Sequence, residues 1–325
     1  ANKDLKATTN HKLEFSLNGS HKKQSFNITA FYEHCNNDFG FSSVYLTTPF
    51  KLYEVPTGVQ NIEYKKHAVY CDGKEANSTN NWIFNTYSQP NNRIKARKKG
   101  IEYSLNLGEI SALKTSIVID GAYIWIKRTS AATSMSVLGY SKGERYPYLP
   151  IYPAGNGSIS DRFNTNVRFI THIPKLKMIF STTAQIVWRE TARNIYEDSD
   201  GNNIYYLEHN AQTRPEGSYY VDPIKFYDKD GVCHEWKEEY RDLTTRECEM
   251  RMSSSVKPNE YGKESYPTTI LFNFRITKEL GKMMELSFLA NNVFKFSKYF
   301  QRTTSSGYTQ LMIPLYFGAE MKLKF

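Results

Sequence analysis

The sequence lacks a long hydrophobic run: no stretch of about 18 consecutive apolar residues occurs among its 325 residues. This absence excludes a transmembrane helix, which needs about 20 mostly apolar residues to cross a bilayer. The first residues, Ala1 to Asp4, form no hydrophobic signal region, so we expect any export signal to lie outside the chain. Stretches rich in alanine and leucine are few, which disfavours an α-helical protein.

Aromatic side chains, by contrast, are abundant. The 24 Tyr, 19 Phe and 4 Trp residues make up 14% of the chain, and aromatic residues are enriched in β-strands. Lys and Arg together (42) outnumber Asp and Glu (33), which gives a formal net charge of +9. This excess is dispersed and no nucleic-acid-binding motif accompanies it, so we expect no nucleic-acid partner. The composition predicts an all-β protein.

The C-terminal residues alternate strictly between two kinds of side chain. Every odd position from 311 to 325 is apolar, whereas Glu320, Lys322 and Lys324 lie between them. Such alternation means that one face of a strand contacts an apolar medium and the other contacts water. The pattern recurs in Leu13–Leu17, Phe26–Tyr32, Ile101–Leu107, Ile117–Trp125, Phe163–Ile173, Met178–Trp188, Ile270–Ile276 and Met284–Ala290. We therefore predict about nine strands, most of them long enough to span a bilayer when tilted.

The predicted strands are joined by connections that alternate in length. The short ones cover residues 18–24, 108–114, 174–177 and 278–283, and the long ones cover residues 36–92, 130–160, 190–267 and 295–310. A compact soluble domain seldom contains a structureless loop of this length, and a β-sandwich has similar turns at both ends. A membrane barrel has short periplasmic turns at one rim and long extracellular loops at the other. We predict an antiparallel transmembrane β-barrel over residues 1–325, with the long connections outside the cell.

Two C-terminal segments carry a family resemblance. Residues 268–296 read TTILFNFRITKELGKMMELSFLANNVFKF, and residues 314–325 read PLYFGAEMKLKF. With the ANNVF element at Ala290–Phe294 and an aromatic last residue, they resemble the last three strands of a TonB-dependent outer-membrane receptor. Residues 99–123 and 164–174 are similar to earlier strands of the large receptors in which a carboxypeptidase-like regulatory domain precedes the plug. The resemblance covers the C-terminal part of such a barrel.

The resemblance implies active uptake of a nutrient ligand, such as a glycan, a peptide or a metal chelate, across the outer membrane of a Gram-negative bacterium. It implies contact with outer-membrane lipid and lipopolysaccharide, energy from TonB acting on an upstream plug, and a surface lipoprotein lid as a further partner. The family has about 22 strands around its plug, whereas we predict about nine strands and no plug. An odd number of antiparallel strands leaves edges that cannot pair with each other. We therefore expect a fragment, or a partly resolved piece, of a longer polypeptide.

Two other functions are compatible with the same patterns. A passive porin-like or adhesin-type outer-membrane barrel would share every predicted strand and lack only the plug. A secreted soluble β-sandwich binding protein would share the alternation but would need no detergent to stay in solution.

The sequence contains no signature of an enzyme or a metal site. There is no G-x-S-x-G, P-loop or H-E-x-x-H motif, so we expect no catalytic residues and no cofactor. The segments Asp198–Asn202 and Asp228–Gly231 each contain an Asp-Gly pair without the spacing of an EF-hand loop. We predict that both are hairpin turns.

The four cysteines are Cys35, Cys71, Cys233 and Cys248, and none belongs to a C-x-x-C pair, which disfavours zinc. They lie two by two in or beside the long connections, where an exported protein is exposed to oxidation. We therefore predict the disulfides Cys35–Cys71 and Cys233–Cys248.

A basic run at residues 95–99 lies beside a predicted strand. Lys95, Arg97 and Lys99 share the parity of Ile101–Leu107, the apolar side of that strand. We expect them to face outward just above the lipid band, where anionic lipid headgroups form charge-assisted hydrogen bonds with cations. A solvated rim, or a β-bulge that turns the run inward, is the alternative.

Candidate ligand contacts come from the lumen and from the long connections. The polar residues expected to face the lumen are Arg168, Gln185, Arg189, Asn273, Arg275 and Glu285. The aromatic residues of the long connections include Trp82, Tyr87, Tyr146, Tyr148, Tyr152, Trp236 and Tyr240. Flat aromatic faces stack on sugar rings and apolar surfaces, which suits a glycan or peptide ligand. The alternative is that the lumen residues bond to one another and to the plug, while the aromatic residues pack the connections.

Overall fold

The computed structural model describes residues 2–137, 140–141, 144–145, 148–207, 219–228, 230–242, 254–256, 259–281, 283–303 and 307–323. Within these residues the protein is all-β, and its helical elements are two short 3-10 helices, η1 (Pro174–Leu176) and η2 (Glu238–Asp242). No helix in this described part is long and apolar enough to cross a membrane. The prediction of an all-β protein is confirmed.

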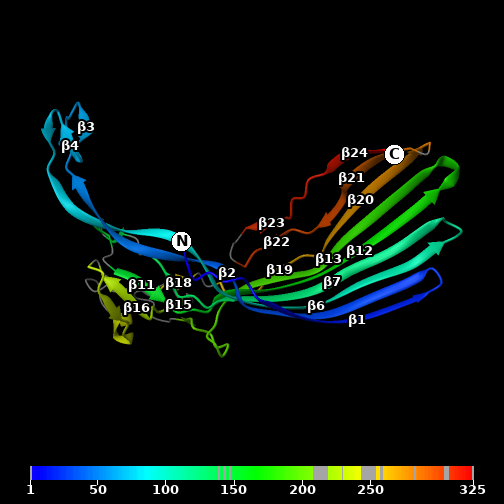
Figure 1. Cartoon of the computed structure of the whole chain (residues 1–325), viewed down its shortest axis with the longest axis horizontal. Helices are drawn as coiled ribbons and strands as arrows, with labels where there is room; N and C mark the ends of the chain where they lie inside the picture. Colours follow the sequence, from blue (N-terminus) through cyan, green and yellow to red (C-terminus); the bar gives the residue numbers. More distant parts are fainter. Residues whose placement is uncertain are drawn as a thin grey trace.

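One antiparallel sheet, which we call the wall, contains most of the structure. Its strands follow one another in chain order, β1-β2-β6-β7-β12-β13-β20-β21-β24, and β19 pairs beside β13. The bounds are β1 Asn10–His21, β2 Gln24–Tyr53, β6 Ser78–Ile110, β7 Thr115–Ser130, β12 Asn156–Ile173, β13 Met178–Tyr196, β19 Glu264–Tyr266, β20 Thr269–Leu280, β21 Met284–Ser297 and β24 Tyr316–Leu323. Figure 1 shows the wall as a curved sheet with its tight hairpin turns at one end.

All nine segments predicted from the alternation form strands of this wall. The chain order of the strands follows from the short turns, because a turn of a few residues leaves the next strand only the neighbouring position. In three of these turns Lys22, Lys114 and Lys177 take φ values of 54°, 50° and 47°. The last strand is shorter than predicted and begins at Tyr316, because Pro314 has no N–H group for the ladder.

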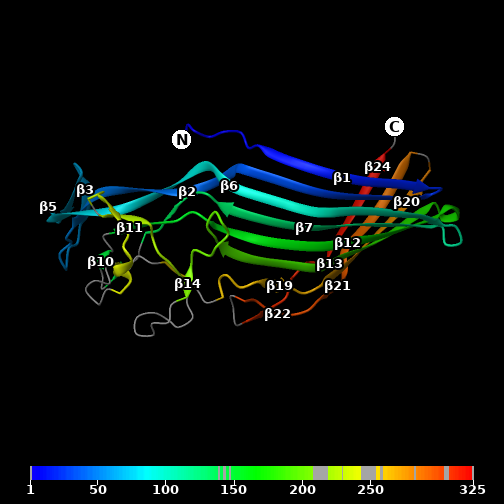
Figure 2. The same ribbon diagram turned by 90° about the horizontal axis from the view of Figure 1, so that it is seen from below.

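The other end of the wall carries five small sheets within the described residues. Their strand orders are β3-β4-β5, β14-β15-β18, β17-β16-β11-β8, β10-β9 and β22-β23. Their bounds are β3 Ile62–Lys65, β4 Ala68–Cys71, β5 Lys74–Glu75, β8 Ser134–Met135, β9 Tyr140–Ser141, β10 Glu144–Arg145, β11 Tyr148–Tyr152, β14 Tyr206–Leu207, β15 Tyr219–Val221, β16 Lys225–Asp228, β17 Cys233–Glu235, β18 Ser254–Val256, β22 Phe300–Gln301 and β23 Tyr308–Thr309. All of them lie in segments predicted as long connections, and Figure 2 shows them away from the hairpin turns.

Residues 36–92 differ from the loop that we predicted. Here β2 and β6 continue as a two-stranded arm, paired from Gly40 with Asn91 to Tyr53 with Ser78. The arm leaves the wall and ends in the sheet β3-β4-β5 (Figure 1). Two lone strands bury neither face completely, so their sequence shows no regular alternation between apolar and polar side chains. The prediction of a loop was wrong for this reason.

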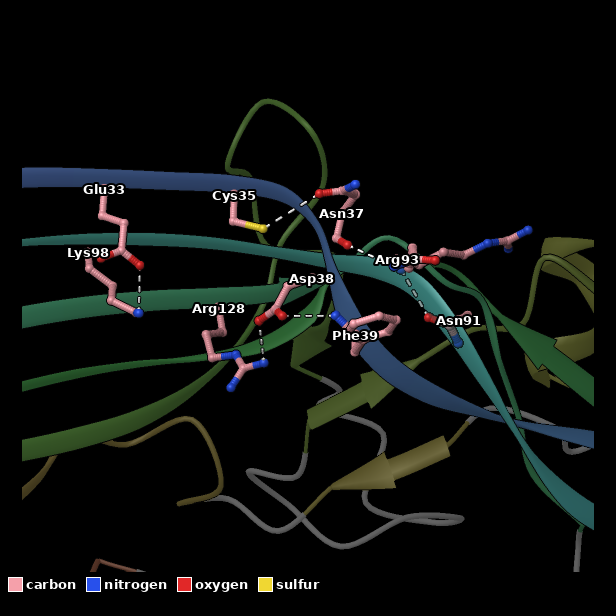
Figure 3. A network of polar contacts seen from close by, with 10 residues as sticks. Glu33, Cys35, Asn37, Asp38, Phe39, Asn91, Arg93, Lys98 and Arg128 are labelled. Atoms are coloured by element: carbon pink, nitrogen blue, oxygen red, sulfur yellow. Dashed lines mark hydrogen bonds and ion pairs between the residues drawn. The ribbon is translucent and has the colours of Figure 1, made fainter. Parts of the chain in front are cut away.

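The arm begins at an irregularity in the ladder between β2 and β6. The register shifts between Cys35 and Asp38 and again between Asp38 and Gly40. The Asp38 carboxylate accepts a hydrogen bond from the Phe39 N–H at 2.9 Å and one from Arg128 of β7 at 3.0 Å (Figure 3). Bulges release backbone groups from the ladder, and here a side chain binds one of them while an ion pair joins the base of the arm to the wall.

Two asparagine side chains hold the segment before β1 against the base of the arm. Asn92 Nδ2 donates to the Lys6 carbonyl at 2.9 Å, and Asn92 Oδ1 accepts from the Lys6 N–H at 2.7 Å. Asn37 Nδ2 donates to the Ala7 carbonyl at 3.0 Å, and Asn37 Oδ1 accepts from the Thr9 N–H at 2.8 Å. A side-chain amide has the donor and acceptor of a peptide group. Each asparagine therefore supplies the hydrogen bonds that the backbone of a neighbouring strand would otherwise provide.

Replacing Asn92 by leucine removes this donor and acceptor at similar volume. A lost hydrogen bond of about 1 kcal/mol corresponds to a fivefold change in local opening, so we expect the Lys6 amide of Asn92→Leu to exchange with deuterium about fivefold faster. Asn85→Leu, at an exposed position of the arm, is the control and should leave the Lys6 rate unchanged. Equal Lys6 rates in Asn92→Leu and the unmodified protein would contradict the role of the Asn92 amide.

The wall is open at both edges. Among the described residues, the outer edges of β1 and β24 pair with no other strand. The path from β1 to β24 passes through nine strands, each antiparallel to the next, so these two strands run in the same direction. Strands that run in the same direction cannot pair as antiparallel neighbours. The described residues therefore form an open sheet, not a closed cylinder.

Candidate functional site

The register of the wall aligns its side chains into two faces, because directly paired residues project to the same side. One row of paired residues is Phe26, Leu105, Ile119, Val167, Ala184, Phe272 and Phe294. The next row toward the arm is Leu17, Ile28, Tyr103, Gly121, Thr165, Ile186, Ile270 and Phe296. We call the side that bears these rows the apolar face. It is continuous across the wall.

The apolar face is open to its surroundings. Leu13 and Phe15 of β1 are 74% and 73% exposed, and Phe288 of β21 and Phe317 of β24 are 61% and 63% exposed. No second layer of the described residues covers these side chains. A continuous exposed apolar surface is rare on soluble monomers, so this face is suited to an apolar medium. The predicted last residue of the face, Phe325, lies outside the described residues.

Aromatic side chains of the apolar face reach across strands. The Tyr103 hydroxyl lies 2.6 Å from the Thr165 hydroxyl, with β7 between them, and Trp188 Nε1 donates to the same Thr165 oxygen at 2.8 Å. Tyr103 crosses β7 over Gly121, where a Cβ atom would lie 2.4 Å from the Tyr103 hydroxyl oxygen. The glycine therefore permits the crossing. The polar atoms of both rings find a partner on an otherwise apolar surface.

The opposite side, which we call the polar face, is joined by hydrogen bonds across strands. Arg275 of β20 donates to the Ser287 hydroxyl at 3.1 Å and to the Glu320 carboxylate at 2.9 Å, and so links three strands. Asn166 Nδ2 donates to the Asp120 carboxylate at 2.8 Å. Such polar side chains require water or a polar partner on this side.

Most of the residues predicted to face the lumen lie on the polar face. The register places Arg168, Gln185, Asn273, Arg275 and Glu285 there. These side chains come from β12, β13, β20 and β21, so they share one surface and do not converge on a single pocket.

Arg189 lies on the apolar face, and its predicted position was wrong. The register between β12 and β13 shifts at Phe163 and Asn164, which leaves Trp188 as the additional residue of a β-bulge. A bulge inverts the parity of every later residue in the strand. Arg189 Nε and Nη2 bind the two carboxylate oxygens of Asp161 at 2.7 and 3.1 Å. This guanidinium therefore neutralises a carboxylate of the wall.

A further register shift lies at the ANNVF element, and the Asn273 side chain binds a backbone N–H group there. The register between β20 and β21 shifts between Phe272 and Phe274, and Asn292 has a φ of 59°. Asn273 Oδ1 accepts from the Asn292 N–H at 2.8 Å, and Asn292 Nδ2 donates to the Pro314 carbonyl at 2.9 Å. Asparagine tolerates positive φ better than most residues. The pair fixes where the chain enters β24.

We expect Asn273→Ala to lower the free energy of unfolding by about 1–3 kcal/mol, because the Asn292 N–H loses its acceptor. Urea titration followed by tryptophan fluorescence measures the change. Asn291→Ala, in the same element, is the control and should cost less. If the two variants are equally destabilised, the Asn273 side chain does not hold the bulge.

The predicted disulfide Cys35–Cys71 does not form. Both cysteines are buried free thiols, with Cys35 at the base of the arm and Cys71 in β4 at its tip. A strand advances about 3.3 Å per residue, so the length of the arm far exceeds the Cα separation of a disulfide. The pairing was predicted from a loop that is in fact an extended arm. Cys233 is exposed, and Cys248 lies outside the described residues.

The predicted aromatic contacts divide into separate groups. Tyr148 packs edge-on against Phe226 with ring centroids 5.3 Å apart, and Trp236 packs against Tyr240 at 5.4 Å. Phe226 and Tyr240 are also in contact, at 6.4 Å, so Tyr148 and Trp236 belong to one cluster. Trp82 and Tyr87 lie on the arm, Tyr152 lies in β11, and Tyr146 lies outside the described residues.

A tyrosine cluster that we did not predict packs the connection after β13. Tyr152 and Tyr196 are buried with Val221, and Tyr205 and Tyr261 pack against them with their own rings stacked at 4.0 Å. Burial raises the pKa of the Tyr152 and Tyr261 hydroxyls, because a phenolate is poorly solvated there. Spacing in the sequence gave no signal for this cluster, since its members come from three separate segments.

The cluster should make the protein sensitive to alkaline pH. An unfolded tyrosine ionises near pH 10, whereas these hydroxyls stay protonated in the folded protein. Their contribution to stability is complete below about pH 10 and is lost as pH rises further. We expect Tyr152→Phe to lose less stability than the unmodified protein between about pH 10 and 12, measured by urea titration. Tyr64→Phe, whose ring is exposed, should behave as the unmodified protein; a Tyr152→Phe curve parallel to it would contradict the assignment.

The two Asp-Gly segments form turns closed by their own side chains. Asp198 Oδ1 accepts from the N–H groups of Asp200 and Asn202 at 2.9 and 2.8 Å. Asp228 Oδ1 does the same two and four residues later, between the paired strands β16 and β17. In the described part of the chain, no group of His, Cys, Asp and Glu side chains could hold a metal ion.

Lys95, Arg97 and Lys99 lie on the same side of β6 as the apolar face. They pair in order with residues 129, 127 and 125 of β7, and the register runs without a shift from Ile94 to Asn106. The register shift against β2 at this level adds its extra residue to β2 and not to β6, so Lys95, Arg97 and Lys99 keep the same side of the strand.

No protein-family model, no curated protein and no solved structure matches this chain.

Proposed function

We propose that this chain forms part of the wall of an outer-membrane β-barrel, in a receptor of the TonB-dependent type. The supporting observation is the apolar face, which is continuous from strand to strand and exposed on side chains such as Phe288 and Phe317. Hydrocarbon has no hydrogen-bonding partner to offer, so a wall in lipid must present apolar side chains and pair its backbone groups internally. Both conditions hold along the interior strands of this sheet.

The polar face supports a water-filled lumen on the other side. Ser287 is buried and accepts a hydrogen bond from Arg275. The register places Arg168 and Gln185 on the same face as Arg275. Porin-like walls alternate lipid-facing and lumen-facing residues in this way. In the proposal, Arg168, Gln185, Asn273, Arg275 and Glu285 line the lumen.

The two ends of the wall support the orientation. Tight turns such as residues 22–23 join the strands at one end, whereas the arm and the five small sheets lie at the other. Outer-membrane barrels have short periplasmic turns and long extracellular loops. The arm and the tyrosine cluster are then extracellular.

The open edges favour a large barrel over a small one. Unpaired edge groups in lipid cost several kcal/mol each, so β1 and β24 need further strands to complete the wall. Together with the resemblance of residues 268–296 and 314–325, this favours the TonB-dependent type over a passive porin-like or adhesin-type barrel. The nutrient ligand is a glycan, a peptide or a metal chelate, TonB supplies the energy through an upstream plug, and a surface lipoprotein covers the extracellular end.

A pair of neighbouring arginine substitutions tests the membrane placement. Phe272 lies on the apolar face and Leu271 on the polar face of β20, at the same depth. An arginine on the lipid face costs about 2–4 kcal/mol near the middle of the bilayer. We therefore expect Phe272→Arg to reduce the fraction of protein inserted into phosphatidylcholine vesicles sharply, and Leu271→Arg to insert as the unmodified protein does, measured by vesicle flotation.

Two results would count against the proposal. One is an unmodified protein that stays monomeric in buffer without detergent, which would favour the secreted soluble β-sandwich. The other is equal insertion of Phe272→Arg and Leu271→Arg.

A further inference from the structure

We infer that Lys95, Arg97 and Lys99 form a binding site for the phosphate groups of membrane lipid, at the arm-side border of the apolar face. This inference rests on the proposed function and deepens it.

The position of the three residues is the first argument. On the apolar face, two adjacent rows of paired residues across β1, β2, β6 and β7 differ in the type of their side chains. The row Leu13, Tyr32, Lys99 and Trp125 has three apolar or aromatic members. The next row toward the arm is His11, His34, Arg97 and Lys127. Aromatic residues followed by cations mark the level at which hydrocarbon gives way to headgroups.

The pairing of charges is the second argument. Most of the cations around this site are neutralised within the protein: Lys98 by Glu33 at 2.7 Å, Lys127 by Glu197, Arg128 by Asp38 at 3.0 Å and Arg189 by Asp161 at 2.7 Å. Lys95 and Arg97 form no ion pair with any described residue. They are two steps apart on one strand and face the same way. Their charge is available for an anion from outside the protein.

The aromatic neighbour of Lys99 is the third argument. The Lys99 ammonium lies 4.8 Å from the centroid of the Trp125 ring, which holds it by a cation–π contact and leaves its N–H donors free for an acceptor. The apolar indole ring of Trp125 lies against the Lys99 ammonium, on the apolar face. A lipid whose acyl chains lie on the apolar face would present its phosphate at this height.

A pocket beside the cations has room for the headgroup. It has a volume of about 360 Å³ and is lined by Lys95 and Arg97, with Thr129 and Ser130 adding hydroxyl groups. Glu197, Asp198 and Asp200 also line this pocket. Glu197 pairs with Lys127, and the Asp198 carboxylate accepts hydrogen bonds from N–H groups of its own turn.

Phosphate fits this site better than a carboxylate does. A guanidinium binds two phosphate oxygens at once, while ammonium groups add point charges that can approach a third oxygen. The adjoining apolar face identifies the source as a lipid, because a free anion would gain nothing from it. We therefore assign the site to a phosphorylated glycolipid of the outer leaflet.

The test compares charge removal at the two ends of the wall. The triple variant Lys95→Gln, Arg97→Gln, Lys99→Gln is matched by Lys22→Gln, Lys175→Gln, Lys177→Gln, which removes the same charge at the hairpin turns. The protein, purified in a zwitterionic detergent, is titrated with bis-phosphorylated lipid A, with dephosphorylated lipid A and with inorganic phosphate, and binding is measured by native mass spectrometry.

Each cation near a membrane surface contributes about fivefold in affinity for anionic lipid. We expect the first triple variant to bind phosphorylated lipid A about 100-fold more weakly than the unmodified protein. The control variant should bind it as the unmodified protein does, and dephosphorylated lipid A should not distinguish the three. Equal affinity of both triple variants for phosphorylated lipid A would overturn the inference, as would full competition by equimolar inorganic phosphate, which would identify a soluble anion as the ligand.

Insertion into neutral phosphatidylcholine separates this inference from the proposed function. All three proteins should insert equally, because that lipid has no net charge. If the unmodified protein fails to insert, the proposed function is wrong and the inference falls with it. If only the first triple variant fails, the cations support the fold, and headgroup recognition is wrong while the proposed function stands.

Discussion

The structure depends on a ladder of backbone hydrogen bonds between sequential antiparallel strands. Because each pair fixes which residues stand opposite each other, a single slip by one residue would move every apolar side chain of a strand to the polar face. The register keeps rows such as Phe26 to Phe294 in line over seven strands. The two faces exist only because the ladder holds this alignment.

Most departures from the ladder lie where the wall ends and the arm or the small sheets begin, whereas the shift between Asn106 and Gly108 lies beside a hairpin turn. The shifts at Asp38, at Trp188 and opposite Asn273 all lie toward that end of their strands. In each case a side chain binds a group near the irregularity: Asp38 binds its neighbouring N–H, Asp161 binds Arg189, and Asn273 binds the Asn292 N–H. The bulges therefore act as defined changes of direction, with their own polar partners.

The strands of the wall could be predicted from the sequence because apolar side chains recur at every second residue. In Ile270–Ile276 and Met284–Ala290 every residue of the apolar face is apolar, although Leu271 and Leu289 are apolar on the polar face as well. What lies beyond the wall could not be predicted in the same way. Arg189 was placed on the wrong face because one additional residue inverts parity, and no local signal marks Trp188 as that residue. The predictions of a loop at residues 36–92 and of a disulfide across it were wrong because two lone strands show no regular alternation of apolar and polar side chains. The tyrosine cluster unites segments far apart in the chain, so spacing could not reveal it. The placement of Lys95, Arg97 and Lys99 was predictable because β6 is regular through that run.

The shared direction of β1 and β24 has an arithmetic consequence. Hairpins are added to a meander two strands at a time, and two more strands at either edge reproduce the same mismatch of direction. Any cylinder that includes this sheet and is antiparallel throughout must therefore receive an odd number of additional strands, so duplication of whole hairpins alone cannot complete it. At least one of the additional strands is then not paired with another in a hairpin, and through this single strand the chain passes from one rim of the cylinder to the other.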